Sequence, residues 1–284
     1  MKSDAICSGA SPIAIGGIGG SGTRLIARLL MELGYFMGPD LNESLDNLWF
    51  TLLFKRPAIL EASPDEFSRL TRLFVSGMTG GPPPEDGDAR FIDLLAHESR
   101  PAEFPVEWFL ARAASLKTAR TNPSPVAWGW KEPNTHIVIP RLRQCLPGLK
   151  YLHVMRNGLD MAFSGNQTQL RFWGAWLIGD KIELTPRYSL KYWRVVHERI
   201  LTLGQEMEGD LLLLDYDQFC RSPAEGLSHL LAFLGLDISR DRQSKLISHV
   251  HPPASLGRFK QHGTQDFDPE DLAFATRMGY DGTL

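Results

Sequence analysis

The residues best suited to chemistry form a glycine cluster near the start of the chain, Gly16–Gly22, with the sequence GGIGGSG. Glycine carries no Cβ, so successive backbone N–H groups in such a loop can approach an oxyanion closely. Behind the cluster, Leu25, Leu29 and Leu33 recur every fourth residue, which predicts an amphipathic helix whose positive end faces the same point. The segment therefore predicts a phosphate or sulfate site, and a βα turn that binds nothing is the plain alternative.

Two familiar nucleotide motifs nearly fit this loop. Gly17–Gly22 has the spacing of a Walker A loop, but the chain continues Thr23-Arg24 instead of Lys followed by Ser or Thr. The lysine that reaches the β- and γ-phosphates is therefore missing, which argues against an ordinary ATPase or GTPase. The same segment also matches the GxGxxG dinucleotide pattern, with Asp40 near the expected place of the ribose carboxylate. An NAD-dependent oxidoreductase therefore remains an alternative.

Two further strands are predicted, and each ends in a cation. The first is Val126–Lys131 and the second is Lys150–Arg156, with a predicted helix over Ile137–Leu146 between them. Because parallel sheets bind ligands at the carboxyl ends of their strands, we expect Lys131 and Arg156 at the same rim as the glycine loop. A solvated strand end for the lysine and a structural ion pair for the arginine are the alternatives.

Composition limits the class of protein. With 284 residues, 43% of them hydrophobic, the chain suits one elaborated domain. The net charge of −3 argues against a nucleic-acid partner, so an anionic ligand must be held by a few placed cations. The three cysteines are widely spaced, which predicts neither a disulfide nor a zinc site. We find neither a signal peptide nor an apolar run long enough for a membrane span, and we expect a cytoplasmic protein.

Several motifs in one order resemble the sulfotransferase superfamily, enzymes that use 3′-phosphoadenosine 5′-phosphosulfate (PAPS). The glycine loop is similar to the loop that holds the 5′-phosphosulfate in that family. The residues that this similarity assigns to the nucleotide are Gly19, Gly20, Ser21, Gly22, Thr23 and Arg24. The other matches are Trp128–Pro133, which contains Lys131; Met155–Ser164, which contains Arg156 and Ser164; Leu211–Phe219, which contains Tyr216; and Gly257–Lys260, which contains Arg258 and Lys260.

The resemblance implies a role for each match. Arg156 and Ser164 look like the pair that binds the 3′-phosphate, with Tyr216, Arg258 and Lys260 as further nucleotide ligands. The tryptophan-lysine segment looks like the lysine motif of the bacterial and Golgi tyrosylprotein branches. The implied reaction moves a sulfuryl group to an acceptor hydroxyl or amine by in-line displacement, leaves adenosine 3′,5′-bisphosphate and needs no metal. The implied acceptor is a small molecule or a carbohydrate.

The expected fold is α/β, with a P-loop-like parallel sheet of about four to five strands flanked by helices. One domain over residues 1–284 should carry a helical insertion at about 40–124, acting as a lid, and a C-terminal flap at about 249–284. Ser63-Pro64, followed by Glu66, predicts a helix start within the insertion, because serine caps and proline suits the first turn.

The chain also departs from the family pattern. Gly20 stands where relatives usually carry Lys or Arg, so Lys131 is expected to supply the catalytic cation. By analogy with the tyrosylprotein branch we take Glu43 as the base, with Asp46 and Asp40 as alternatives. Glu43 can also merely cap the helix expected over residues 46–55. The missing basic residue keeps a second alternative open, a non-catalytic protein that binds 3′-phosphoadenosine nucleotides.

Overall fold

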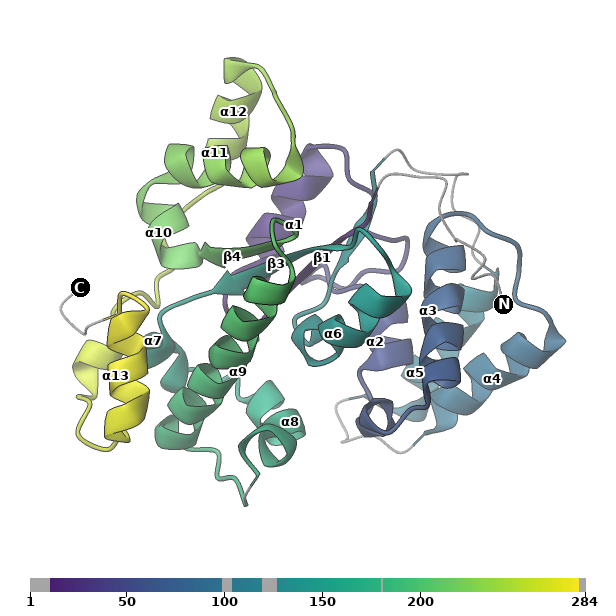
Figure 1. Cartoon of the computed structure of the whole chain (residues 1–284), viewed down its shortest axis with the longest axis horizontal. Coiled ribbons are helices and arrows are strands. Elements are labelled where there is room, and N and C mark those ends of the chain that lie inside the picture. The colour runs from purple at the N-terminus through teal and green to yellow at the C-terminus, as the bar shows by residue number, and fades with distance from the viewer. Residues whose placement is uncertain (1–10, 99–103, 119–126, 180, 281–284) are drawn as a thin grey trace. The chain divides into compact units, whose positions relative to one another are not determined.

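The structure is a computed structural model that describes residues 11–98, 104–118, 127–179 and 181–280 (Figure 1). In these ranges four strands form one sheet in the order β2-β1-β3-β4. Their bounds are β1 Ile13–Gly17, β2 Gly129–Lys131, β3 Lys150–Met155 and β4 Leu211–Asp215. The predicted α/β fold with a small parallel sheet is confirmed. The ends of the predicted insertion (119–124) and of the predicted flap (281–284) lie outside the described residues.

The strands form where short apolar runs can be buried on both faces. All five residues of β1 are buried, as are those of β3 from Tyr151 onward. β3 pairs in parallel with β4, from Tyr151 opposite Leu211 to Met155 opposite Asp215. Continuous apolar runs of this kind are typical of parallel strands covered by helices. Each predicted strand therefore ends where the apolar run ends, which places Gly17, Lys131 and Arg156 at or just beyond strand termini.

The chain divides into two compact units. The first comprises Met1–Ala14, Ala27–Glu132 and Val138–Lys150, and the second comprises Ile15–Ile26, Pro133–Ile137 and Tyr151–Leu284. The boundary runs through β1 and through α1 (Thr23–Glu32). Lys131 and the helical insertion thus belong to the first unit, and the glycine loop and Arg156 belong to the second.

The insertion in the first unit is helical, as predicted. Its elements are α2 Leu48–Phe54, η1 Pro57–Leu60, α3 Pro64–Met78, α4 Asp86–His97 and α5 Val106–Thr118. Ser63 caps α3 by accepting the N–H of Glu66 at 3.1 Å. The helix expected over 46–55 begins only at Leu48, because the Asn47 side chain accepts the N–H of Phe50 and ends the preceding loop. Glu43 therefore lies in a loop before α2.

Aromatic side chains form the core of the insertion. Phe50 of α2 stacks on Trp130 of β2 with ring centroids 5.6 Å apart, and Phe74 of α3 meets the same indole edge-on at 5.2 Å. Such pairs add to the free energy gained from burial alone. Nearby, the buried Arg56 forms ion pairs with Glu66 and Glu98. The insertion therefore packs against β2 through α2 and α3.

The second unit carries the remaining helices. They are α7 Gly158–Ala162, α8 Thr168–Ile178, α9 Pro186–Glu206, α10 Tyr216–Arg221, α11 Pro223–Leu234, α12 Arg240–Ile247, η2 Arg258–Gln261 and α13 Pro269–Arg277. The long α9 packs against α7, α8 and α13 (Figure 1). Arg194 of α9 holds α13 through ion pairs with Glu270 and the buried Asp271. α6 (Thr135–Cys145) starts in this unit and continues in the first.

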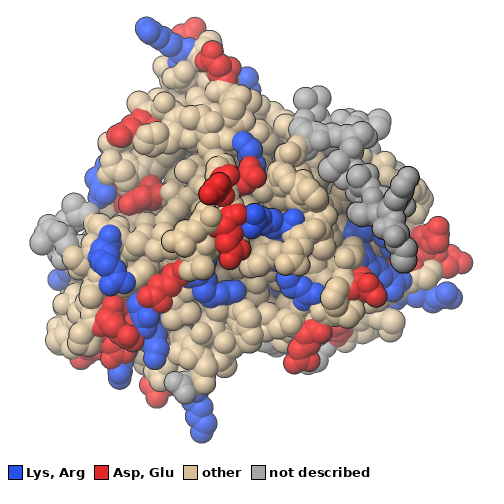
Figure 2. Space-filling model, viewed as in Figure 1, with Lys and Arg blue, Asp and Glu red and all other residues tan. Residues whose placement is uncertain are grey.

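Charges of both signs are interspersed on one face of the protein. Figure 2 shows basic and acidic side chains mixed over the face that it displays, in keeping with the net charge of −3. No helix in the described ranges combines the length and the apolar character that a bilayer crossing requires.

Candidate active site

The glycine loop has the backbone geometry of an anion cradle. Gly20 and Gly22 have φ values of +93° and +99°, a region that other residues rarely adopt. At Gly22 a Cβ would also lie 2.2 Å from the ring of Tyr216, so only glycine fits there. The Ser21 hydroxyl is buried and has no hydrogen-bond partner among the described residues. A buried hydroxyl without a partner inside such a loop fits an incoming oxyanion.

The residues around the loop differ in exposure. Thr23 is buried at the first turn of α1, whereas Arg24 is exposed. Gly20 is also exposed, and no heavy atom of another segment lies within 4 Å of the position that its Cβ would take. The place where a basic residue was expected is therefore open space at the surface of the second unit.

Arg156 follows β3 directly and is buried, with only 8% of the residue exposed. Its Nη1 donates to the carbonyl of Gly20 at 3.3 Å, and its Nη2 donates to the hydroxyl of Ser255 at 2.7 Å. The Nε atom lies 3.6 Å from a carboxylate oxygen of Asp217. The guanidinium thus joins the glycine loop to the C-terminal segment, and its partners on these two sides are uncharged.

Tyr216 and Asp217, in the first turn of α10, contact the glycine loop and the residues that follow β3. The ring of Tyr216 packs on Gly22, and burial raises the pKa of its hydroxyl to about 12, so the ring stays neutral. Asp217 accepts the N–H of Asn157 at 2.7 Å. Burial raises the pKa of Asp217, while this hydrogen bond and Arg156 oppose the rise. Asp217 therefore fixes the end of β3 and the arginine that follows it.

Asp160 of α7 binds the predicted flap through two backbone N–H groups. Asp160 accepts the N–H of Gly257 at 2.7 Å and the N–H of Phe259 at 3.1 Å. Arg258 donates to the carbonyl of Phe163 at 3.2 Å, and Lys260 is exposed. These bonds hold η2 against the turn that follows α7.

Ser164 does not contact Arg156 through any hydrogen bond in the structure. It lies in the turn after α7 and not on a helix, and its hydroxyl accepts the N–H of Asn166 at 3.2 Å. The hydroxyl that accepts a hydrogen bond from the guanidinium of Arg156 is instead that of Ser255, a residue that the sequence motifs did not single out. Arg258 lies next to Ser164, because it bonds to the preceding residue, Phe163.

In the first unit, Lys131 forms a second buried centre. Its side chain is 3% exposed, and its Nζ donates to a carboxylate oxygen of Asp46 at 2.5 Å and to the carbonyl of Ser44 at 3.0 Å. Between these two residues Leu45 has a φ of +63°, which is uncommon outside glycine. That backbone turn brings the Ser44 carbonyl and the Asp46 carboxylate to one ammonium group.

The three carboxylates considered as bases are in different surroundings. Asp46 also accepts the side-chain amide of Asn42 at 2.9 Å, whereas Glu43 is exposed. Asp40 forms an ion pair with Arg112 of α5, with an N–O distance of 3.1 Å. The structure thus brings Asp46 to Lys131 and engages Asp40 elsewhere.

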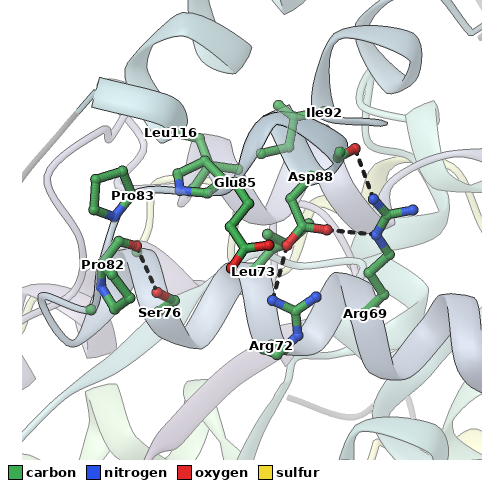
Figure 3. Close-up of a pocket in the computed structure, with 14 residues that line it drawn as sticks. Arg69, Arg72, Leu73, Ser76, Pro82, Pro83, Glu85, Asp88, Ile92 and Leu116 are labelled. Carbon is green, nitrogen blue, oxygen red and sulfur yellow. Dashed lines mark hydrogen bonds and ion pairs between the residues drawn. The ribbon is translucent and has the colours of Figure 1, made fainter. Parts of the chain in front are cut away.

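A cavity of about 580 Å³ lies within the insertion, lined by α3, α4, α5 and the proline-rich loop between α3 and α4 (Figure 3). Charged side chains that line the cavity form ion pairs with one another. Arg69 and Arg72 both bind Asp88 and lower the pKa of that carboxyl. At the inner wall, a Cβ on Gly77 would lie 2.9 Å from the indole of Trp49. The cavity therefore backs onto α2, the helix that starts just after Asp46.

The structure thus groups the predicted site residues into two sets, Lys131 with Asp46 and Arg156 with Gly20. It adds Asp160, Asp217 and Ser255, which the sequence reasoning missed. Asp160 lies inside the Met155–Ser164 motif and Asp217 next to Tyr216, so their places in motifs were the available signal. Ser255 offered none, because its partner is 99 residues away.

The chain matches one family model and several solved structures. Residues 12–240 match the model described as the sulfotransferase family. The sulfotransferase domain of the Synechococcus PCC 7002 olefin synthase superposes with a TM-score of 0.52 at 16% identity, covering 99% of each chain. A sulfotransferase from Alicyclobacillus acidocaldarius gives a TM-score of 0.44 at 15% identity, covering 95% of this chain and 96% of that one.

The comparison with curated protein sequences finds no match. The likeness to the Synechococcus domain shows a shared fold, because the identity is only 16%. The family match is the more informative finding, since it spans most of the chain and includes the glycine loop, Lys131, Arg156 and Tyr216. On this ground, the protein belongs to the sulfotransferase family.

Proposed function

We propose that this sulfotransferase takes its sulfuryl group from PAPS and transfers it to an acceptor hydroxyl or amine. The observation that carries the proposal is the buried guanidinium of Arg156, which touches both the glycine loop and the C-terminal segment. Arginine binds phosphate through two parallel N–H bonds and keeps its charge when buried. A dedicated cation beside a 5′-anion loop suits a nucleotide with a second phosphate at its 3′ position.

The 5′ end of the donor is assigned to the loop from Gly19 to Arg24. The buried hydroxyl of Ser21 and the N–H groups around Gly20 and Gly22 supply donors for a phosphosulfate. Arg156 would hold the 3′-phosphate, with Ser164, Arg258 and Lys260 as nearby ligands, while Tyr216 shapes the loop from behind. The proposed binding mode involves no metal.

In the proposed reaction the acceptor oxygen attacks sulfur in line with the bond to the 5′-phosphate. A new S–O bond forms as the old one breaks, and the departing phosphate keeps the electron pair. The acceptor proton passes to a carboxylate, for which the contact with Lys131 favours Asp46 over Glu43. Lys131 stabilises the negative charge that grows on the leaving group. The products are a sulfated acceptor and adenosine 3′,5′-bisphosphate.

The ion pair between Lys131 and Asp46 couples proton acceptance by Asp46 to the stabilisation of the leaving group by Lys131. While Asp46 is ionised, it neutralises most of the field of the ammonium group at 2.5 Å. Once Asp46 accepts the acceptor proton, that field is released at the moment when the leaving oxygen becomes negative. The pair therefore supplies its charge in step with the reaction.

The alternatives fit the structure less well. An NAD-dependent oxidoreductase would need Asp40 on a ribose, but Asp40 is engaged with Arg112. That reading also gives no role to the buried Arg156. A non-catalytic nucleotide-binding protein would need Arg156 and the glycine loop, but has no use for the buried pair of Lys131 and Asp46.

A thermal-shift comparison tests the nucleotide. Ligands that bind only the folded state raise the melting temperature with the logarithm of their concentration over Kd. Adenosine 3′,5′-bisphosphate should stabilise the protein more than adenosine 5′-phosphate at equal concentration, and NAD should have no effect. Turnover of a ³⁵S-labelled donor with a mixed library of phenols, sugars and amines then tests transfer. Stabilisation by NAD alone would exclude the proposal, and nucleotide binding without transfer would favour the non-catalytic alternative.

A further inference from the structure

Gly17, the last residue of β1 before the glycine loop, is held by hydrogen bonds at both its N–H and its carbonyl. The N–H of Gly17 donates to the carbonyl of Pro133 at 3.1 Å, and the carbonyl of Gly17 accepts the side-chain amide of Gln169 at 3.1 Å. Gln169 is the second residue of α8 and is 5% exposed. A buried glutamine thus reaches from a helix to the last residue before the loop.

The direction of this bond determines the direction of the next donor. In a trans peptide the C=O of one residue and the N–H of the following residue point in opposite directions. Because the Gly17 carbonyl faces Gln169, the N–H of Ile18 points away from α8. We propose that Gln169 is a positioning residue that aims the Ile18 N–H at the 5′-anion of the nucleotide. This inference rests on the proposed function for the identity of the anion.

The orientation of the Gln169 amide is itself fixed. Its Oε1 accepts the hydroxyl of Tyr192 at 3.4 Å and lies 3.1 Å from Nε2 of His136. Burial lowers the pKa of His136 to about 3, so the imidazole is neutral near pH 7. A neutral ring facing an amide oxygen carries its proton on Nε2 and donates it. With Oε1 occupied by two donors, the NH₂ group is left to face Gly17.

The space behind the loop explains why a restraint is needed there. A small cavity of about 20 Å³ lies between Ile18 and Gly19 of the loop and the side chains of Gln169 and Tyr192. This is room for roughly one water molecule. Glycine peptides rotate easily, and beside a cavity the peptide between Gly17 and Ile18 can turn its carbonyl inward, where it would repel an anion. The amide of Gln169 opposes that rotation.

The same helix that orients Gln169 also holds the strand end next to the 3′ site. Tyr192 of α9 bonds to Gln169, and the neighbouring Trp193 donates from its indole to the carbonyl of Arg156 at 3.0 Å. Two consecutive residues of α9 therefore support the two groups that are assigned to opposite ends of the nucleotide. Loss of the Gln169 contact should affect only the 5′ end, because Trp193 holds Arg156 independently.

Nucleotide affinity of the purified full chain tests the proposal. Gln169→Leu should weaken adenosine 5′-phosphate and adenosine 3′,5′-bisphosphate by the same factor, about tenfold, as expected for a misdirected donor to a charged group. Gln167→Leu is the matched control, because Gln167 lines the same cavity but bonds to Ser164 and Ser189 instead of the loop. It should change the affinity for adenosine 5′-phosphate less than twofold.

A second variant separates positioning from packing. In Gln169→Glu the ionised carboxylate cannot donate to the Gly17 carbonyl, whereas the protonated form can. Burial raises the pKa of such a carboxyl, so the ratio of variant to wild-type affinity should rise severalfold as the pH falls from about 8 to about 6. Dividing by wild type removes the titration of the nucleotide phosphates, whose second pKa is about 6.

The native groups around this position do not titrate in that range. Burial lowers the pKa of His136 to about 3 and of His197 to about 4, and it lowers the pKa of His153 well below its usual value. Burial raises the pKa of Tyr192 beyond its usual range. Arg199, which acts on His136 and Tyr192 electrostatically, keeps its charge throughout. A pH-dependent ratio would therefore report the introduced carboxyl.

Three results would overturn the inference. One is wild-type affinity of folded Gln169→Leu for both nucleotides, and another is a loss confined to the 3′-phosphorylated nucleotide. If Gln169→Leu fails to fold, a pH-independent ratio for Gln169→Glu overturns it. A wild-type protein that binds both nucleotides equally would instead count against the PAPS proposal, and the 5′ effect of Gln169 would still be measurable.

Discussion

The two buried cations of this protein, Lys131 and Arg156, are held in different ways. Lys131 is bound by one loop, through the carbonyl of Ser44 and the carboxylate of Asp46. Arg156 is bound by three separate segments, through a carbonyl at 3.3 Å, a hydroxyl at 2.7 Å and a carboxylate at 3.6 Å. The lysine is thus closely neutralised by a carboxylate, whereas the closest partners of the arginine are uncharged.

This difference indicates different tasks. A guanidinium whose closest partners are neutral, with its carboxylate partner 3.6 Å away, can exchange those neutral partners for a phosphate. An ammonium paired with a carboxylate at 2.5 Å delivers its charge only when that carboxylate is protonated or moved. Arg156 is therefore suited to binding and Lys131 to a step in which a proton moves. The variants below test this division.

The largest effect is expected from Lys131→Ala. Removing a cation that stabilises charge in the transition state should lower turnover about 10²- to 10³-fold. Affinity for adenosine 3′,5′-bisphosphate should change less than about threefold, because binding is assigned to Arg156 and the loop. The control is Lys181→Ala, at an exposed position. Turnover at the wild-type rate in Lys131→Ala would remove the lysine from the reaction.

The next effect concerns the base. Asp46→Asn keeps the shape and the contact with Asn42 but cannot accept a proton, so turnover should fall about 10²-fold, the lower end for a general base. Glu43→Gln should leave turnover nearly unchanged, because Glu43 is exposed. Steady-state kinetics with a saturating donor makes the comparison. The reverse result would restore Glu43, the residue chosen from the sequence, and reduce Asp46 to a partner of Lys131.

The sequence predicted the parts of this site that are local. The glycine loop followed by a helix, the strands that end at Lys131 and Arg156, and the Ser63 cap all depend on neighbouring residues, and the structure has them. The choice between Glu43 and Asp46 depends on the backbone of Leu45, whose positive φ no spacing rule indicates. The partners of Arg156 depend on chain segments that meet only in the folded protein, so Ser255, which lies in none of the motifs, could not be found from local pattern.

A smaller effect is expected from Arg156→Ala, and it should appear in binding. Loss of a desolvated, charged hydrogen bond should weaken adenosine 3′,5′-bisphosphate by at least about 2 kcal/mol, roughly 30-fold. Affinity for adenosine 5′-phosphate should hardly change, which provides the control within the same protein. Titration calorimetry with both nucleotides measures the ratio. An equal loss for both would mean that Arg156 does not read the 3′ end, and the contrast with Lys131 would fail.

The smallest effect separates Ser255, which contacts Arg156, from Ser164, which the sequence motif assigns to the 3′-phosphate. Ser255 occupies the Nη2 edge of the guanidinium, while the hydroxyl of Ser164 is bonded to Asn166. When a phosphate takes that edge, the Ser255 hydroxyl can turn and donate to it, because Asp160 holds the adjacent backbone at Gly257. Ser255→Ala should therefore weaken adenosine 3′,5′-bisphosphate about tenfold, the lower end for one hydrogen bond to a charged group, and leave adenosine 5′-phosphate unchanged.

Ser164→Ala provides the comparison, since the sequence motif assigns the 3′-phosphate to Ser164. If Ser255 reads the phosphate, the loss in Ser255→Ala exceeds the loss in Ser164→Ala under the same conditions. If only Ser164→Ala loses affinity, Ser255 is a partner that leaves Arg156 when the nucleotide arrives, and the motif assignment stands. In that case Lys131 and Arg156 would each have a partner that must leave before the cation acts, Asp46 for the lysine and Ser255 for the arginine. The two cations would then differ only in the charge of that partner.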